Sequence, residues 1–78
     1  MYIHVGDDIL IKTEEIIAIF DKESLNGRSL EKLLAQYKQS NIHYSKGLFK
    51  SVIVTKDHVY YSPLTTGTLK RRSTQIVV

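Results

Sequence analysis

The amino-acid sequence predicts an α+β fold, in which a small, twisted, mostly antiparallel sheet of about five short strands packs against one amphipathic helix and a short C-terminal helix. The first observation is that residues 51–55 and 59–62 are runs of β-branched and aromatic residues separated by a polar turn, which is the pattern of a β-hairpin. The second is a leucine stripe at helical spacing within residues 30–37. The third is the length of 78 residues, which suits one domain, residues 1–78, with a thin core.

The N-terminal segment predicts a second hairpin. Residues 2–5 and 9–11 are short β-rich runs, and Gly6, Asp7 and Asp8 between them supply turn chemistry. Two adjacent carboxylates would also suit a metal or acid–base chemistry. Beside a glycine in a turn, however, such side chains commonly accept hydrogen bonds from local backbone amides. We therefore interpret Asp7 and Asp8 as turn residues.

Residues 16–20, Ile-Ile-Ala-Ile-Phe, predict a central strand that is apolar on both faces. One face can lie beneath the protein's own helix, whereas the other needs a second layer or another subunit. The same holds for residues 52–54 and 59–61. Because small folds without cysteines or metals are commonly stabilised by association, we expect a homo-oligomer.

The next element is an amphipathic helix, whose apolar residues recur at i, i+3, i+4 and i+7 while polar residues occupy the other face. We expect Ser29 to be its N-cap, and residues 40–41 to end it. A leucine stripe at this spacing is typical of a core-facing surface. The stripe consists of Leu30, Leu33, Leu34 and Tyr37.

After this helix, residues 42–44 predict a short strand, and a loop then leads into the main hairpin. Beyond Pro63, the threonine-rich run 65–68 can cap a short last helix with Leu69 facing inward. Residues 75–78 form an apolar tail that would add a strand or pack between subunits.

Positive charge is concentrated in the second half of the chain. Residues 1–39 carry five basic and seven acidic residues, for a net charge of −2, whereas residues 40–78 carry six basic residues and one acidic residue, for a net charge of +5. This asymmetry favours a polyanionic partner, with nucleic acid first and an anionic membrane surface second. There are two alternatives to a polyanionic partner. The charges can form a solvated surface that keeps the protein soluble, and the basic residues of the last helix can stabilise its C-terminus without binding any ligand. The candidate phosphate contacts are Lys46, Lys50, Lys70, Arg71 and Arg72.

No motif indicates a catalytic residue, a metal site or a cofactor. The three histidines, His4, His43 and His58, lack metal-ligand spacing, and we interpret them as isolated. There is no cysteine nucleophile, no serine in a G-x-S-x-G setting and no phosphate loop. We therefore expect a protein that is not an enzyme.

The sequence also bears on which nucleic acid is bound and on where in the cell the protein is found. Aromatic residues near the lysines would allow stacking on single-stranded RNA, but no run matches the aromatic RNP pattern, so contact with a duplex backbone is favoured. No apolar run approaches the ~20 residues that span a bilayer, and the N-terminus does not resemble a signal peptide. The expectation is a soluble, cytoplasmic protein without a membrane partner.

Three stretches carry a resemblance to a known family: residues 2–8, which read YIHVGDD, the strand at 16–21, and residues 60–64 with 68–70. Through them nearly the whole chain resembles the RemA-like family, whose members are associated with activation of biofilm-matrix genes. The resemblance implies a LytTR-like fold and a ring-shaped homo-oligomer whose repeated basic edges contact duplex DNA.

The resemblance also exposes a difference at the DNA-contacting positions. The family has an arginine before the strand that corresponds to residues 16–20, and an arginine-rich loop before residues 51–55. This sequence has Glu15 at the first place and Lys46-Gly47-Leu48-Phe49-Lys50 at the second. Lysines neutralise phosphates but lack the bidentate fork of arginine. Three possibilities stay open: weaker DNA binding, a relocated surface at residues 70–72, or a partner role without DNA.

The sequence thus predicts a DNA-binding transcriptional regulator that acts as a cyclic homo-oligomer, with the five basic residues as phosphate contacts. The main alternative is a non-enzymatic assembly partner of a related regulator, without direct DNA binding. RNA binding is a third interpretation.

Overall fold

The computed structural model describes residues 2–6 and 9–74. Three short 3-10 helices, at residues 13–15, 22–24 and 39–41, connect the longer elements. The main elements in chain order are β1 (Tyr2–His4), β2 (Leu10–Lys12), β3 (Ile16–Asp21), α1 (Gly27–Leu34), β4 (Ile42–His43), β5 (Ser51–Thr55), β6 (Val59–Ser62) and α2 (Thr66–Thr74). The predicted α+β class is confirmed.

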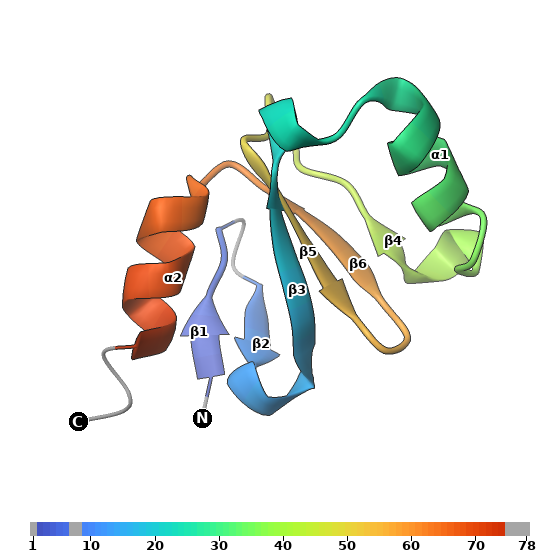
Figure 1. Ribbon diagram of the computed structural model, residues 1–78. Helices are drawn as coiled ribbons and strands as arrows, with labels where there is room; N and C mark the ends of the chain where they lie inside the picture. The colour runs from blue at the N-terminus through green and yellow to red at the C-terminus, as the bar shows by residue number, and fades with distance from the viewer. Residues whose placement is uncertain (1, 7–8, 75–78) are drawn as a thin grey trace.

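The described strands form two small sheets rather than one. β1 and β2 pair as a two-stranded antiparallel sheet, and the other strands form a four-stranded sheet in the order β3-β5-β6-β4. Both predicted hairpins are therefore present, and only the pairing of β4 with β6 is parallel. In Figure 1 the β1–β2 hairpin and α2 lie on one side of β3, and α1 lies on the other side, beyond β4.

The prediction that residues 16–20 form a central strand is wrong. β3 lies at an edge and has β5 as its only strand partner within the described part of the chain. Ile17 is accordingly 66% exposed. β5 and β6 occupy the centre instead. The apolar sequence of β3 correctly indicated that both of its faces are partly buried. It does not indicate how many strands pair with β3, which is why the central position was predicted wrongly.

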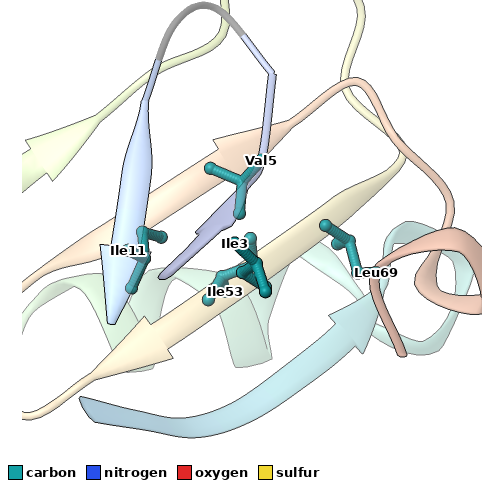
Figure 2. Close-up of a cluster of buried hydrophobic side chains, with 5 residues drawn as sticks. All are labelled: Ile3, Val5, Ile11, Ile53 and Leu69. Carbon is teal, nitrogen blue, oxygen red and sulfur yellow. The ribbon is translucent and has the colours of Figure 1, made fainter. Parts of the chain in front are cut away.

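β5 is covered on both faces by the protein's own elements. On one face Ile53 packs with side chains from β1, β2 and α2, and Figure 2 shows this cluster, which consists of Ile3, Val5, Ile11, Ile53 and Leu69. On the other face Val52 and Val54 pack with the leucine stripe of α1. The second layer that we expected from either this chain or another subunit thus comes from the N-terminal hairpin and α2. The apolar character of β5 does not itself require an oligomer.

The amphipathic helix is confirmed, but both of its ends differ from the prediction. Its N-cap is Asn26, whose Oδ1 accepts a hydrogen bond of 2.8 Å from the Ser29 amide, so Ser29 stands at the third helical position. The helix ends at Leu34, and residues 40–41 belong to a separate 3-10 helix. The leucine stripe faces the core as predicted, and the Tyr37 hydroxyl donates to the Thr55 carbonyl at 2.8 Å.

Two buried serines fasten the N-terminal hairpin and α2 to the central sheet. Ser51 and Ser62 lie opposite each other on β5 and β6, and both are fully buried. The Ser62 hydroxyl donates to the Val5 carbonyl at 2.6 Å and accepts from the Leu64 amide at 3.1 Å. The Ser51 hydroxyl donates to the Leu64 carbonyl at 2.7 Å. These bonds satisfy backbone groups that would otherwise be buried at a cost.

The predicted C-terminal helix is also present. The Thr65 hydroxyl accepts from the Thr68 amide at 3.2 Å, which is an N-cap bond, and Leu69 is fully buried as expected. Within the described residues no helix is long and apolar enough to cross a membrane. Asp7, Asp8 and the tail at residues 75–78 lie outside the described residues, so our interpretations of them stay predictions.

Gly6 is required twice by the structure. Its φ is +96°, a conformation that side chains with a Cβ rarely adopt. A Cβ placed there would also lie 2.9 Å from both Cγ and Cδ of Pro63. The β1–β2 turn therefore approaches the segment after β6 more closely than any other residue type permits.

We predict that Gly6→Ala lowers the free energy of unfolding by roughly 1–3 kcal/mol, through backbone strain and the contact with Pro63. Chemical denaturation measures this change. The matched control is Gly47→Ala, because a Cβ at Gly47 would meet nothing within 4 Å. Equal losses in the two variants would show that the close approach at Gly6 contributes nothing.

Candidate functional site

The loop at residues 44–50 joins β4 to β5 and carries two of the candidate phosphate contacts. The side chains of Lys46 and Lys50 are both exposed. The backbone of Lys50 is held on both sides, since its amide donates to the Ser62 carbonyl at 2.8 Å and its carbonyl accepts from the Lys22 amide at 3.0 Å. Figure 1 shows the loop at the end of the sheet where β3 leads toward α1 and where α2 begins. Lys50 is thus an exposed charge on a fixed backbone.

An aromatic anchor, defined as Tyr44, Phe49 and Tyr61, holds this loop against the sheet. The Phe49 ring meets the Tyr61 ring edge-on at 4.6 Å between centroids, and Tyr44 lies 4.9 Å from Tyr61. The Lys22 ammonium lies 5.3 Å from the centroid of Phe49. Burial, and secondarily the nearby Tyr44, raise the pKa of Tyr61, so its hydroxyl stays neutral at physiological pH. Sequence reasoning placed Tyr61 in a strand, which is confirmed, but missed the anchor, because its rings come together only when β4 and β5 flank β6.

The surroundings of Lys50 are mixed in charge. A surface hollow beside it is lined by Lys22 and Lys50 together with the carboxylates Asp21 and Glu23. The two signs balance there, so a positive excess at this end of the sheet depends on Lys46. Thr65, the N-cap of α2, also lines the hollow, which brings the positive end of that helix dipole to the same place.

The three basic residues of α2 differ in their surroundings. Lys70 and Arg71 are exposed, whereas Arg72 is partly buried and its Nη1 donates to the His4 carbonyl at 2.7 Å. Arg72 therefore fastens α2 to β1. This agrees with the alternative that helix-terminal cations act without a ligand.

The loop and helix groups of basic residues form two separate clusters. Lys50 lies beside Thr65 at the start of α2, and Arg72 stands seven residues further along, which corresponds to roughly 10 Å of helix axis. The structure thus brings Lys46 near Lys50 but does not merge either of them with Arg72.

Glu15 lies at the opposite end of the sheet from the lysine loop. It directly precedes β3, whereas Lys50 bonds to the residue just beyond β3's last residue, Asp21. Six strand residues span roughly 20 Å. Within one chain, then, Glu15 is too distant to oppose the charges of Lys46 and Lys50 directly.

The structure also pairs two histidines that the sequence analysis had interpreted as isolated. The Nε2 atom of His43 on β4 lies 3.0 Å from Nδ1 of His58 in the β5–β6 turn, and both rings stack against Tyr60. Burial, and secondarily the neighbouring His58, lower the pKa of His43. The interpretation was wrong because these histidines are 15 residues apart and meet only through the parallel β4–β6 pairing. In the described part of the chain no group of three or more His, Cys, Asp or Glu side chains could hold a metal ion.

Comparison with known proteins places these features in a family. The family model described as extracellular matrix regulatory protein A-like, or RemA-like, matches residues 2–72. Extracellular matrix regulatory protein B of Bacillus subtilis (strain 168) is 40% identical over 73 residues, which cover 94% of this chain and 90% of that protein. The family model spans the lysine loop, the aromatic anchor and residues 70–72 of α2.

From the pairing of His43 with His58 we predict that the free energy of unfolding decreases in acid. Because the pKa of folded His43 lies below its ordinary value of 6.5, the unfolded chain binds more protons as the pH falls through that value. The free energy of unfolding should therefore decrease below about pH 6.5, and denaturation at several pH values measures it. His43→Gln should flatten the dependence, whereas the control His4→Gln, on the exposed face of β1, should keep it. An unchanged pH profile in His43→Gln would contradict this assignment.

Proposed function

We propose that this chain, which belongs to the RemA-like family of extracellular matrix regulatory proteins, is a transcriptional regulator that binds duplex DNA as a cyclic homo-oligomer. Its relatives are matrix regulatory proteins by name, and we place its targets among biofilm-matrix genes. The observation that carries the DNA-binding proposal is the lysine loop, in which two exposed ammonium groups stand on a segment held by the aromatic anchor.

A rigid loop is suited to phosphate contact because little conformational entropy is lost when it binds. The backbone bonds of Lys50 and the packing of Phe49 fix the loop in advance, and only the lysine side chains have to be ordered. Lys70 and Arg71 are exposed and belong to the separate basic cluster on α2, in which Arg72 is engaged with His4. We therefore assign the principal contacts to Lys46 and Lys50, and secondary contacts to Lys70 and Arg71.

A single chain offers too few cations for tight binding, which is why the proposal includes a homo-oligomer. Copies arranged in a ring present the lysine loop repeatedly, and contacts that are weak alone add through effective concentration. The edge of β3 supports such an association, because its outer side has no strand partner among the described residues and Ile17 is 66% exposed there.

The second candidate function is assembly with a related regulator, without contact to DNA. The same exposed edge of β3 favours it, since a strand of another protein can pair there. The carboxylates Asp21 and Glu23 beside Lys50 also favour it, because they offset the positive charge of the loop. In this case the protein acts through its partner's DNA contacts.

The first test of function is equilibrium binding of the purified protein to a fluorescent duplex long enough to contact several copies, at a series of salt concentrations. We expect the logarithm of affinity to fall linearly with the logarithm of salt concentration, with a slope steeper than about −3. The double variant Lys46→Ala/Lys50→Ala should weaken binding to all sequences and make the slope shallower by about 1 for each phosphate that a lysine no longer neutralises.

The matched control is Lys32→Ala/Lys38→Ala, which removes the same charge from α1 and the segment after it. If it weakens binding as much as the loop variant, the effect reflects net charge alone and Lys46 and Lys50 are not the site. Absence of duplex binding by the unaltered protein at low salt would favour the assembly partner.

The second test concerns the edge of β3. Ile17→Lys should reduce the size of the assembly in sedimentation or light scattering, because a charge at an unpaired strand edge opposes pairing with another copy. Gln36→Lys adds the same charge at an exposed position after α1 and should leave the assembly unchanged. A full-sized assembly in Ile17→Lys would exclude this edge as the interface.

A further inference from the structure

We propose that Leu48 is a wedge residue that enters the minor groove, separates two stacked base pairs and thereby makes the protein prefer easily kinked base steps. This inference rests on the proposed DNA-binding function and adds a second, apolar component to its charged contacts. The juxtaposition that carries it is an almost fully exposed leucine midway between Lys46 and Lys50.

The exposure of Leu48 stands out among the described apolar side chains. Leu48 is 87% exposed, compared with 66% for Ile17 and 60% for Leu10. A scattered apolar residue on a surface is ordinary by itself. Leu48 differs because of what holds it and what flanks it.

The neighbouring residues fix the direction of Leu48. Phe49 turns inward onto Tyr61 and beneath the Lys22 ammonium, and Lys50 is tied to the sheet by two backbone hydrogen bonds. Phe49 is directed inward, whereas Leu48 directly before it is 87% exposed, so Leu48 projects from a loop whose next two residues are anchored to the sheet.

The flanking lysines match the geometry of a groove. Lys46 and Lys50 are each two residues from Leu48, so their Cα atoms lie within about 7 Å of its Cα. The minor groove is about 6 Å wide, so flexible lysine side chains on both sides of Leu48 can reach phosphates on both of its walls. An apolar side chain between cations is the device by which many minor-groove proteins unstack a base step and bend the duplex.

The surroundings of Leu48 favour DNA over the other partners that an exposed leucine can serve. The hollow that Leu48 borders is lined by Phe49 and Thr65 and by four charged side chains, those of Asp21, Lys22, Glu23 and Lys50. The apolar area around Leu48 is therefore bounded by charges, whereas an interface between two copies would cover about 800 Å² on each partner. An anionic membrane would place negative charge across the whole face and repel those carboxylates. A duplex concentrates its charge in two rows of phosphates and leaves the space between them for an apolar tip.

A wedge carries sequence preference without hydrogen bonds to bases. Pyrimidine–purine steps, TpA above all, unstack easily, whereas A-tracts are stiff. Insertion of Leu48 should therefore cost least at a TpA step, and the protein should prefer duplexes with such a step where the loop docks.

The test uses two duplexes of equal length and composition, one with TpA steps at helical intervals and one with those bases rearranged into A-tracts. Dyes at the two ends report bending by energy transfer, and titration reports affinity and its salt dependence. We expect the unaltered protein to bend the TpA duplex and to bind it roughly three- to tenfold more tightly than the A-tract duplex, which is the range that burial of one leucine side chain permits after the cost of unstacking.

Four variants separate the wedge from the charges. Leu48→Ala and Leu48→Gln should lose the bend and the TpA preference while keeping the salt slope, because the lysines remain. Leu48→Met should keep both properties. Leu10→Ala, the same change at an exposed position on β2, should behave as the unaltered protein.

Each outcome decides between specific alternatives. Equal bending by the unaltered protein and Leu48→Ala overturns the wedge and leaves the proposed function intact. Failure of the unaltered protein to bind any duplex at low salt overturns both. A smaller assembly in Leu48→Ala assigns the residue to contact between copies instead. Binding to phosphatidylglycerol vesicles that depends on Leu48, without any effect of Leu48 on DNA bending, assigns it to a membrane surface; either result overturns the wedge.

Discussion

The rest of the structure depends on the hydroxyl group of Ser62. It donates to the Val5 carbonyl and accepts from the Leu64 amide, so one buried atom joins the N-terminal hairpin, the central sheet and the segment that begins α2. Ser51, opposite it on β5, adds the bond to the Leu64 carbonyl. Polar groups in such a small core are tolerable only because each is satisfied, and in the described part of the chain no buried side-chain polar atom lacks a partner.

This arrangement explains where the surface is free to function. Because the hairpin and α2 cover one face of β5 and α1 covers the other, both faces at the centre of the sheet are occupied by the chain itself. Among the accessible features of the described residues are one edge of the sheet, β3, and the loop at residues 44–50. An edge can pair with another strand, and a loop supported by a rigid sheet can present side chains without losing order on binding. The two parts of the proposed function, assembly and DNA contact, correspond to these two features.

The basic residues of the loop and those of α2 differ in the groups that surround them. Lys46 and Lys50 project from the loop, with Asp21 and Glu23 close enough to moderate the charge around Lys50, whereas Arg72 is engaged with a backbone carbonyl on β1. A surface with partly compensated charge binds a polyanion less tightly and more selectively by shape than a strongly basic one.

The sequence by itself determined the elements whose formation depends on local pattern. Alternation and β-branching specified the hairpin of β5 and β6, the spacing of Leu30, Leu33 and Leu34 specified the buried face of α1, and the threonines before Leu69 specified the start of α2, because side-chain direction within a strand or helix follows from its period. The exposed lysines of the candidate site were also evident as charge. Only the tertiary structure decided that β3 is an edge, that His43 meets His58, that Arg72 bonds to His4 and that Glu15 lies far from Lys50. These features depend on which segments become neighbours after folding. The periodicity of residues along the chain does not determine that, because it reflects only local side-chain direction.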